Sequence, residues 1–317
     1  MKRILVTGAN GFIGTALCKK LLSEKCLITA ALRRNSTPRL PRSIRTVRIG
    51  GIDDTTDWAM ALDRIDTVIH LAARVHVMAE DAPNALDAYR KVNVQGTRKL
   101  AVDAAKAGVR RIVFLSSVKV NGEQTQSAFR EEDQPLPEDD YGISKLEGEN
   151  ELKSIADKSG TEIVVIRPPL VYGPEVKANF LALMRLIDRK IPLPLANIMN
   201  RRSFIFLDNL VDAILHCMNH PAAAGQTYLV SDDTDVSTPE LVKSIAAAMN
   251  RPVILFPFPE QWLYFIGRLL GKKQTIDRLC RSLTVDISKI KNDLSWTPPF
   301  DIEFGLRKTA LWYRQNQ

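Results

Sequence analysis

Apolar and polar residues recur with two different periods along the first half of the chain. Short apolar runs bounded by polar residues have the length of buried strands, at 3–8, 27–32, 46–50, 66–73, 110–117 and 161–168. Longer segments between them have apolar residues three or four apart, as on one face of a helix, at 12–25, 89–108 and 141–160. Buried strands joined by helices predict an α/β domain with a Rossmann-type, doubly wound parallel sheet.

The pattern changes after Pro168, where regular alternation fades and prolines become frequent. Residues 201–219 predict a short strand that leads into a helix. The segment 238–250 opens with Thr-Pro, a capping hydroxyl followed by a proline in the first turn, and so predicts another helix.

The two parts of the chain therefore differ in their pattern of apolar runs and prolines, and we expect them to form two lobes. The dinucleotide-binding domain is expected at 1–167, with a return segment near 201–232. A smaller, discontinuous C-terminal lobe is expected from 168–200 and 233–317. The cleft between such lobes is where a substrate is expected to bind.

Composition excludes several classes of protein. The 317 residues are 45% hydrophobic and 25% charged, which is typical of a soluble globular chain. The net charge of +8 comes from scattered Lys and Arg residues without a basic run, so it favours small phosphorylated ligands over nucleic acid. The sequence has no run of eighteen apolar residues, so no membrane span is predicted.

Four cysteines without a CxxC pair or metal-ligand spacing indicate a reducing compartment and no metal site. A strand-like run begins at Arg3, which leaves no room for a signal peptide, and we expect a cytoplasmic protein. The most apolar segment, 253–271, contains prolines and charges; buried core or a partner interface is favoured there over membrane-surface contact.

The glycine-rich turn VTGANGFIG lies between the first strand and the first helix. Its glycines are Gly8, Gly11 and Gly14. A helix N-terminus offers free N–H groups and a positive dipole end to a diphosphate, and small residues let the backbone approach it. The alternative is a tight turn without a ligand; a P-loop is excluded because no Gly-Lys-Ser/Thr follows. The remaining residues of the turn expected to contact a cofactor are Asn10, Phe12 and Ile13.

The end of the second strand bears on the identity of that cofactor. An acidic residue at this place commonly binds the ribose 2′-hydroxyl of NAD, whereas an arginine suits the 2′-phosphate of NADP. Here the strand ends in Arg33 and Arg34 without a carboxylate. A guanidinium can form paired hydrogen bonds with a phosphate, so NADP is favoured and NAD is the alternative. The alternative without a ligand is that both arginines are only solvated.

Tyr141 and Lys145 in YGISK are four residues apart at the start of a predicted helix, so they share one face. A neighbouring ammonium lowers the pKa of a tyrosine and makes it a usable acid–base. Ser117 ends a predicted strand at the edge where α/β sheets present ligands. A Tyr-x-x-x-Lys pair by itself is usually a surface pair; together with the glycine turn and the serine it indicates catalysis.

These residues resemble the extended short-chain dehydrogenase/reductases, in particular the NAD-dependent epimerase/dehydratase group that acts on nucleotide sugars. HLAA at 70–73, NVQGT at 93–97, YGISK at 141–145 and RPPLVYGP at 167–174 carry the resemblance. It implies a catalytic triad of Ser117, Tyr141 and Lys145, with Tyr141 and Lys145 also touching the cofactor. It further implies that the cofactor contacts Leu71, Ala72, Ala73, Asn93 and Pro168. Gly51 stands where the family often has an adenine-contacting Asp, and either Asp53 or the backbone is expected to take its place.

Weaker matches in the second half imply a substrate site. KANF at 177–180 is similar to the family loop that touches the nucleotide diphosphate, through Asn179 and Phe180. RRSFIFLDNL places Arg202 where the family has a pyrophosphate-binding arginine. The second such arginine would be Arg281, with Arg278 as the other choice. Lys119 stands where dehydratases have an acid pair, so a 4,6-dehydratase is not expected and Lys119 is expected to contact substrate.

Three functions follow as hypotheses. The first is NADPH-dependent reduction of a UDP-linked 4-keto-6-deoxy sugar for surface polysaccharide biosynthesis, since SSVKVNGE at 116–123 resembles reductases of the UDP-N-acetylquinovosamine type. The second is a UDP-sugar 4-epimerase with tightly bound NAD. The third is an NADP-binding regulator without catalysis, against which the Ser117, Tyr141 and Lys145 set argues. The resemblance also implies a homodimer.

Overall fold

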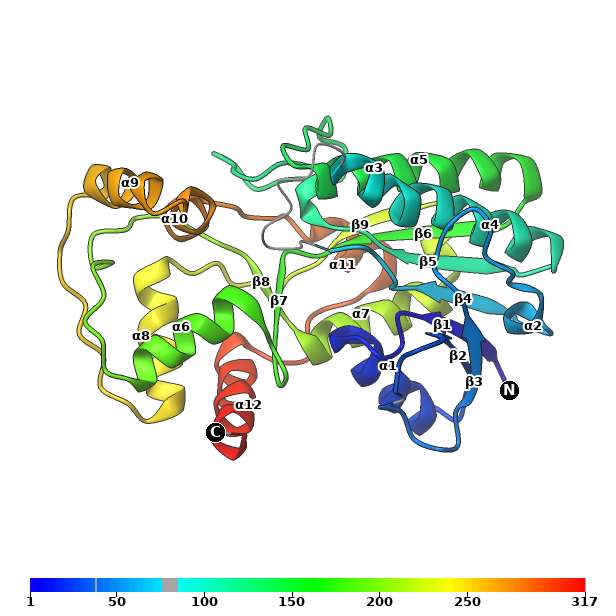
Figure 1. The fold of residues 1–317 in the computed structure, drawn as a ribbon, viewed down its shortest axis with the longest axis horizontal. Helices are drawn as coiled ribbons and strands as arrows, with labels where there is room; N and C mark the ends of the chain where they lie inside the picture. Colours follow the sequence, from blue (N-terminus) through cyan, green and yellow to red (C-terminus); the bar gives the residue numbers. More distant parts are fainter. Residues whose placement is uncertain (38, 76–84, 317) are drawn as a thin grey trace.

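A computed structural model of the protein describes residues 1–37, 39–75 and 85–316. Its main sheet has seven parallel strands in the order β3-β2-β1-β4-β5-β6-β9. The strands are β1 (Arg3–Thr7), β2 (Leu27–Arg33), β3 (Arg45–Ile49), β4 (Thr67–His70), β5 (Arg111–Leu115), β6 (Glu162–Arg167) and β9 (Thr227–Leu229). The expected Rossmann-type, doubly wound sheet is confirmed (Figure 1).

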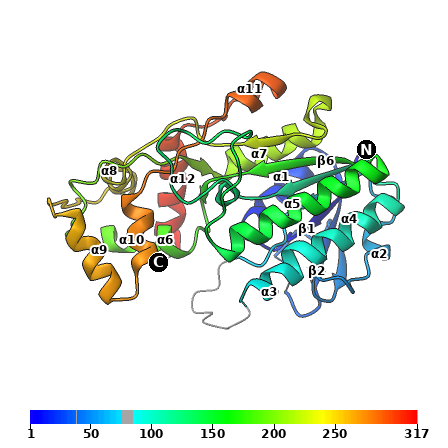
Figure 2. The same ribbon diagram turned by 90° about the horizontal axis from the view of Figure 1, so that it is seen from above.

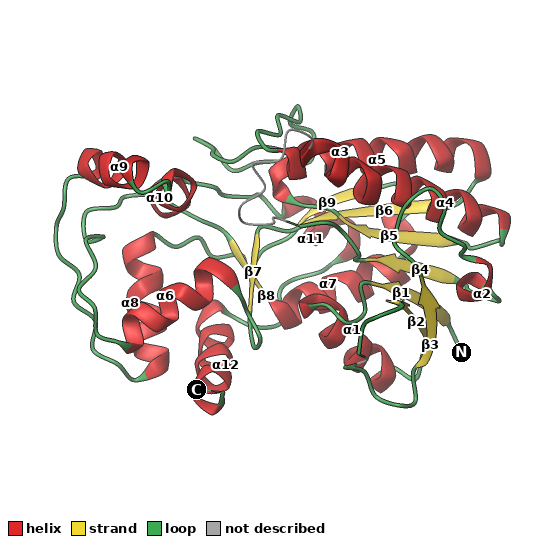
Figure 3. Ribbon diagram, in the orientation of Figure 1, coloured by secondary structure: helices red, strands yellow, loops and turns green. Residues whose placement is uncertain are grey.

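Helices cover both faces of this sheet, as Figure 3 shows by colour. Successive residues of β1 point to opposite faces: Ile4 packs in one cluster with Leu210, and Leu5 packs in another with Leu100. The first face carries α1 (Phe12–Ser23) and α7 (Leu207–Asn219); the second carries α2 (Ala59–Leu62), α3 (Ala85–Arg90), α4 (Thr97–Lys106) and α5 (Asp140–Ser159). Burial on both faces is why these strands are continuously apolar in sequence.

The winding of the sheet reverses beside β1. Thr7, the last residue of β1, is paired with Ala31 of β2 on one side and with His70 of β4 on the other. Connections leave this point toward both halves of the sheet, which opens a crevice at the carboxyl ends of the strands. The glycine turn after β1 and the HLAA segment after β4 therefore meet at the same edge.

The second lobe lies at the opposite end of the molecule from β3 (Figures 1 and 2). It has a two-stranded parallel sheet of β7 (Leu170–Tyr172) and β8 (Phe204–Phe206). Its helices are α6 (Ala178–Asp188), α8 (Thr238–Met249), α9 (Glu260–Leu269), α10 (Lys273–Cys280) and α12 (Ile302–Gln315). The cap of α8 is Ser237, which forms a capping box with Glu240; the hydroxyl expected to cap it, that of Thr238, lies one residue inside the helix.

Two parts of the C-terminal region depart from the sequence expectation. Residues 283–296, assigned there to the second lobe, return to the cofactor domain: Ile290 and Trp296 are buried in the cluster under β1, and Trp296 Nε1 donates to Asp212 of α7 at 2.9 Å. This segment includes α11 (Ser288–Leu294). The apolar stretch 253–271 is only partly buried: Leu263 is its one buried large side chain, and Val253, Leu255, Phe258 and Tyr264 pack against the core of the second lobe while partly exposed. No helix in the described residues is long and apolar enough to cross a bilayer.

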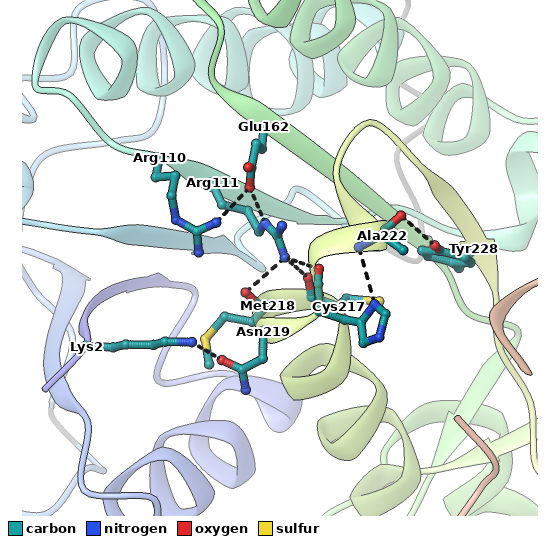
Figure 4. A network of polar contacts seen from close by, with 10 residues as sticks. Lys2, Arg110, Arg111, Glu162, Cys217, Met218, Asn219, Ala222 and Tyr228 are labelled. Carbon is teal, nitrogen blue, oxygen red and sulfur yellow. Dashed lines mark hydrogen bonds and ion pairs between the residues drawn. The ribbon is translucent and has the colours of Figure 1, made fainter. Parts of the chain in front are cut away.

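A buried arginine holds α7 against the edge of the sheet that is remote from the glycine turn (Figure 4). Arg111 of β5 has a fully buried side chain, and its Nη1 donates to the carbonyls of Cys217 and Met218 at 2.8 and 3.1 Å. Its Nε donates to Glu162 at 2.7 Å. The guanidinium therefore satisfies the last carbonyls of α7 and the negative end of its dipole.

Candidate active site

The glycine turn has the geometry of a diphosphate cradle. Gly8 has a φ of +67°, and a Cβ there would lie 2.8 Å from the backbone nitrogen of Ala72. A Cβ on Gly14 would lie 2.2 Å from the carbonyl oxygen of Gly8, so α1 can approach β1 only without a side chain. The N-terminus of α1 has no capping side chain and no acid in its first turn, so its N–H groups are open to an anion. These features fit a dinucleotide.

A cavity of about 690 Å³ extends from this turn across the ends of β2 and β4. Its volume is that of a site for a ligand of cofactor size. The predicted cofactor residues that line it are Gly8, Asn10, Gly11, Phe12, Ile13, Gly14, Arg33, Leu71, Ala72 and Ala73. The apolar walls that sequence reasoning missed are Ile49, Ile52, Val75 and Val92.

The loop that follows β2 is organised by an arginine that sequence analysis did not single out. Arg48 of β3 donates through Nη1 to the carbonyls of Arg33 and Ser36, at 3.1 and 2.5 Å. Arg33 is exposed and lines the cavity, whereas Arg34 lies outside the cavity lining. Arg48 was not apparent from sequence because only strand pairing brings β3 beside β2.

Two predicted cofactor residues use their side chains on protein partners. Asn10 donates to the carbonyl of Thr37 at 2.7 Å and so holds the loop after β2. Asp53 accepts from the hydroxyl of Thr55 at 2.7 Å and lies 3.6 Å from the ammonium of Lys91. The Thr55 hydrogen bond is the main reason that the pKa of Asp53 is lowered. Asp53 lies outside the cavity lining, next to Ile52, which is part of it.

Asn93 joins the cofactor edge to the catalytic helix. It is buried within a π-helical segment, Lys91–Gly96, a distortion that is frequent at functional sites. Its side chain accepts from Arg74 N at 2.8 Å and donates to the hydroxyl of Ser144 at 2.9 Å. Because Ser144 lies beside Lys145 on α5, this one amide positions the loop after β4 and the helix together.

Tyr141 lies in the first turn of α5, with its ring 6.4 Å from that of Tyr89 in an edge-on arrangement. Burial, and then the charge of Asp139, raise the pKa of Tyr141 above its usual value. The sequence predicts a lowered pKa for Tyr141 beside Lys145, but the pKa is raised because burial dominates. The ammonium of Lys145 lies 3.7 Å from the ring centroid of Phe114. Burial therefore favours the protonated phenol, and a base role for Tyr141 needs a positive charge that stabilises the phenolate.

Lys145 is buried, and burial lowers its pKa to about 7, against the opposing attraction of Glu149. The value leaves Lys145 balanced between its charged and neutral forms near physiological pH. An added negative charge at the site, such as a phenolate, favours the ammonium. Loss of the proton from Tyr141 would therefore favour the charged form of Lys145.

Ser117 and Pro168 belong to one braced loop. Ser117 caps a short 3₁₀ turn, and its hydroxyl accepts from Lys119 N at 3.2 Å. The next N–H, that of Val118, donates to the carbonyl of Pro168 at 3.0 Å. The serine is thereby held at the carboxyl end of β5, as the strand pattern predicts, and both residues lie outside the lining of the dinucleotide cavity.

Lys119 is engaged in ion pairs. Its ammonium contacts Glu123 and Asp139. Asp139 also caps α5 by accepting from Gly142 N at 2.7 Å. Lys119 therefore neutralises the carboxylate whose charge acts on Tyr141; contact between Lys119 and substrate stays a prediction.

Glu149 is the next residue on the Tyr141–Lys145 face of α5 and was not among the predicted site residues. Arg167 of β6 binds it with two hydrogen bonds, Nε to Oε1 at 3.0 Å and Nη2 to Oε2 at 2.6 Å. Ser116 also donates to this carboxylate, and all three residues are buried. The repeated spacing of four from Tyr141 was the available signal; the arginine that pairs with Glu149 was not visible in the pattern.

The predicted phosphate-binding arginines lie together in the second lobe. Arg202 donates through Nη1 to the carbonyl of Arg281 at 2.9 Å, and burial lowers the pKa of Arg202 to about 10. The positive charge of Arg278 acts on Arg202 in the same direction. The guanidinium of Arg281 pairs with Asp277 at 2.9 Å. Like charges brought together around Arg202 and Arg278 suit an anion.

The loop residues Asn179 and Phe180 differ in what they present. Asn179 is partly exposed in the first turn of α6, after Ala178 with a φ of +54°. Phe180 is buried and stacks on Tyr172, with centroids 5.5 Å apart. The Phe180 side chain therefore belongs to the lobe core, so the predicted contact with a ligand is left to its backbone.

Fold and site together define an extended short-chain dehydrogenase/reductase, an enzyme that couples a dinucleotide turn to a Ser, Tyr and Lys set. The chain belongs to the NAD dependent epimerase/dehydratase family, whose model matches residues 4–231. The predicted family is thereby confirmed, and the protein is an oxidoreductase or epimerase of this extended type.

Relatives of known name cover the whole chain. A UDP-glucose 4-epimerase of Vibrio cholerae is 44% identical, with 99% of this chain and 96% of the relative aligned. An N-acetyl-alpha-D-glucosaminyl-diphospho-ditrans,octacis-undecaprenol 4-epimerase of Escherichia coli O157:H7 is 27% identical, over 98% of this chain and 94% of the relative. Among solved structures, MoeE5 in complex with UDP-glucose and NAD has a TM-score of 0.78 at 26% identity, covering 99% of each chain.

Proposed function

We propose that the protein is an NAD-dependent UDP-sugar 4-epimerase. The observation that carries this proposal is the 44% identity to the Vibrio cholerae UDP-glucose 4-epimerase over 99% of the chain, together with the intact Ser117, Tyr141 and Lys145 set. Of the hypotheses drawn from sequence, the relatives support this one better than reduction of a 4-keto sugar. The two named relatives share a sugar carried on a diphosphate and a change at C4. We choose the UDP-linked substrate because the relative of higher identity is named for it.

The chemistry divides between the cofactor and this chain. When bound, the nicotinamide supplies hydride acceptance from sugar C4 and hydride return. Tyr141 would act as the base in its phenolate form, which the positive charges of Lys145 and of an oxidised nicotinamide would favour. The phenolate would take the proton of the 4-hydroxyl as the carbonyl forms and give it back afterwards. Ser117 offers its hydroxyl to the same sugar oxygen. Arg202 and Arg278 hold the diphosphate, which leaves the sugar free to present either face.

Two observations bear on the identity of the cofactor, and they favour different dinucleotides. Structural neighbours at 25–26% identity are complexes with NAD, which favours NAD. Arg33 at the end of β2, with no carboxylate beside it in the cavity lining, favours a 2′-phosphate and hence NADP. That second observation supports one further candidate, NADPH-dependent reduction of a UDP-linked 4-keto-6-deoxy sugar.

The test is incubation of the purified protein with UDP-glucose and with UDP-N-acetylglucosamine, followed by NMR analysis of the C4 configuration. We expect the 4-epimer to form without a net change in dinucleotide absorbance. NADPH oxidation on a UDP-4-keto-6-deoxy sugar, without any epimerisation, would contradict the proposal and favour the reductase.

Tyr141→Phe is expected to lower kcat by about 10²–10⁴-fold, because it removes the group that carries the proton. Tyr89→Phe is the matched control, since it removes a hydroxyl from the neighbouring ring and leaves the ring contact. Equal losses in the two variants would show that Tyr141 is not the acid–base.

A further inference from the structure

Helix α9 carries an exposed apolar stripe, here called the outer face of α9. It consists of Trp262, Phe265, Ile266, Leu269 and the adjoining Leu270, spaced as one side of a helix. Their exposed fractions are 56%, 55%, 42%, 71% and 64%. Monomeric proteins rarely expose so many large apolar side chains on one contiguous surface without a binding role.

The outer face is not the side by which α9 joins the lobe. Leu263 and Gly267, one turn apart, are the buried positions of the helix. A Cβ on Gly267 would lie 2.5 Å from Cγ1 of Ile276, so the helix packs closely on α10 through that side. Figures 1 and 2 show α9 at the outer margin of the lobe. The stripe is therefore a second apolar side, with solvent over it.

Cations flank the C-terminal end of this stripe. Arg268, Lys272 and Lys273 are exposed, and none of them has an ion-pair partner among the described carboxylates. Glu260, at the other end of α9, is the one acidic residue in 260–273. An apolar stripe with aromatic residues and flanking Lys and Arg is the composition of helices that lie in a membrane interface.

We propose that the outer face of α9 docks on the surface of an anionic phospholipid bilayer, with the helix parallel to the membrane plane. The aromatic and aliphatic side chains enter the boundary between headgroups and acyl chains, and the basic side chains reach the phosphates. This reverses the preference drawn from the sequence of 253–271. The proposal rests on exposure and charge, and it holds whichever sugar reaction the enzyme performs.

A second copy of the chain fits this surface less well. A twofold interface would pair the outer face with itself and so gather Arg268, Lys272 and Lys273 of both copies in one interface, an excess of positive charge. Only Glu260 could offset that repulsion within the segment. An anionic bilayer satisfies the apolar stripe and the cations together.

Docking would place the substrate lobe beside the membrane. Tyr264, on the inward side of α9, hydrogen bonds with the side chain of Arg281. The carbonyl of Arg281 in turn holds Arg202. Arg202, one of the proposed diphosphate arginines, is therefore linked to the docking helix through Arg281.

The experiment is co-sedimentation of the full chain with vesicles of phosphatidylglycerol and phosphatidylcholine, and with vesicles of phosphatidylcholine alone. We expect the bound fraction to be at least about tenfold higher on the anionic vesicles and to fall as salt rises. Phe265→Ser/Leu269→Ser and Lys272→Glu/Lys273→Glu are each expected to lower binding about tenfold. Met60→Ser, at a 69% exposed side chain on α2, is the matched control and should bind as the wild type does.

Far-UV circular dichroism and thermal unfolding confirm that each variant is folded before vesicles are added. Absence of wild-type binding to anionic vesicles overturns the proposal, as does equal binding of the Phe265→Ser/Leu269→Ser variant. Sedimentation velocity supplies the remaining outcome. An oligomer that dissociates in that variant, without vesicle binding by the wild type, would assign the outer face to self-association and overturn membrane docking.

Discussion

Glu149→Gln tests how the buried charges behind the catalytic helix stabilise the protein. The carboxylate lies between Arg167, which donates two hydrogen bonds at 3.0 and 2.6 Å, and the hydroxyl of Ser116. Both charged side chains are less than a tenth exposed. A neutral amide of the same shape leaves the guanidinium in a buried position without its counter-charge.

The expected loss can be worked from this geometry. Removing one partner of a buried ion pair costs about 3–5 kcal/mol in the free energy of unfolding. Unfolding entropy near 2.1 cal/mol/K per residue gives about 0.67 kcal/mol/K for 317 residues. Division of the first quantity by the second predicts a fall in Tm of about 4–8 °C.

The assay is thermal unfolding by calorimetry at pH 7 of Glu149→Gln, Arg167→Met and the double variant. The double variant removes both charges, so its loss should be smaller than the sum of the single losses by about 2 kcal/mol. Glu147→Gln on the same helix is the matched control. Glu147 pairs with Arg90 with similar hydrogen bonds, but at the surface, and its loss should be much smaller than that of Glu149→Gln. A Tm for Glu149→Gln equal to that of Glu147→Gln, or strictly additive losses, would refute the reasoning.

Two further predictions concern the dinucleotide turn and Lys145. Gly14→Ala is expected to raise the dissociation constant for the dinucleotide at least about tenfold, because its Cβ would lie 2.2 Å from the Gly8 carbonyl; Gly50→Ala has open space and should bind normally in the same titration. Lys145 has a folded pKa of about 7, below its unfolded value of 10.5, so only the unfolded state holds this proton between these values and stability rises with pH there. Between pH 6.5 and 8.5 the wild type should gain about 2 kcal/mol relative to Lys145→Met in urea unfolding, and an unchanged difference would contradict the assignment.

Local sequence was enough to place much of the site. Gly8 and Gly14 act within one local turn and the first turn of α1, so their spacing in the sequence is enough to predict the shape of the diphosphate cradle. Tyr141 and Lys145 share a helix face because four residues make about one turn. The apolar runs determined the strands and the helices between them, and the family predicted from the motifs in these segments is confirmed.

Tertiary structure decided the environment of those residues. Arg48 reaches the loop after β2 only because β3 pairs with β2, and Arg167 meets Glu149 only because β6 lies under α5. The pKa of Lys145 follows from burial above Phe114, and not from its spacing to Tyr141.

The apolar segment around α9 shows the same division between sequence and structure. The apolar residues of α9 recur with a helical period in the sequence. That period does not determine which apolar side packs on α10 and which side is exposed to solvent. Periodicity determines which side chains share a face. What covers that face, and therefore its charge state and its partners, depends on chain segments that are distant in sequence.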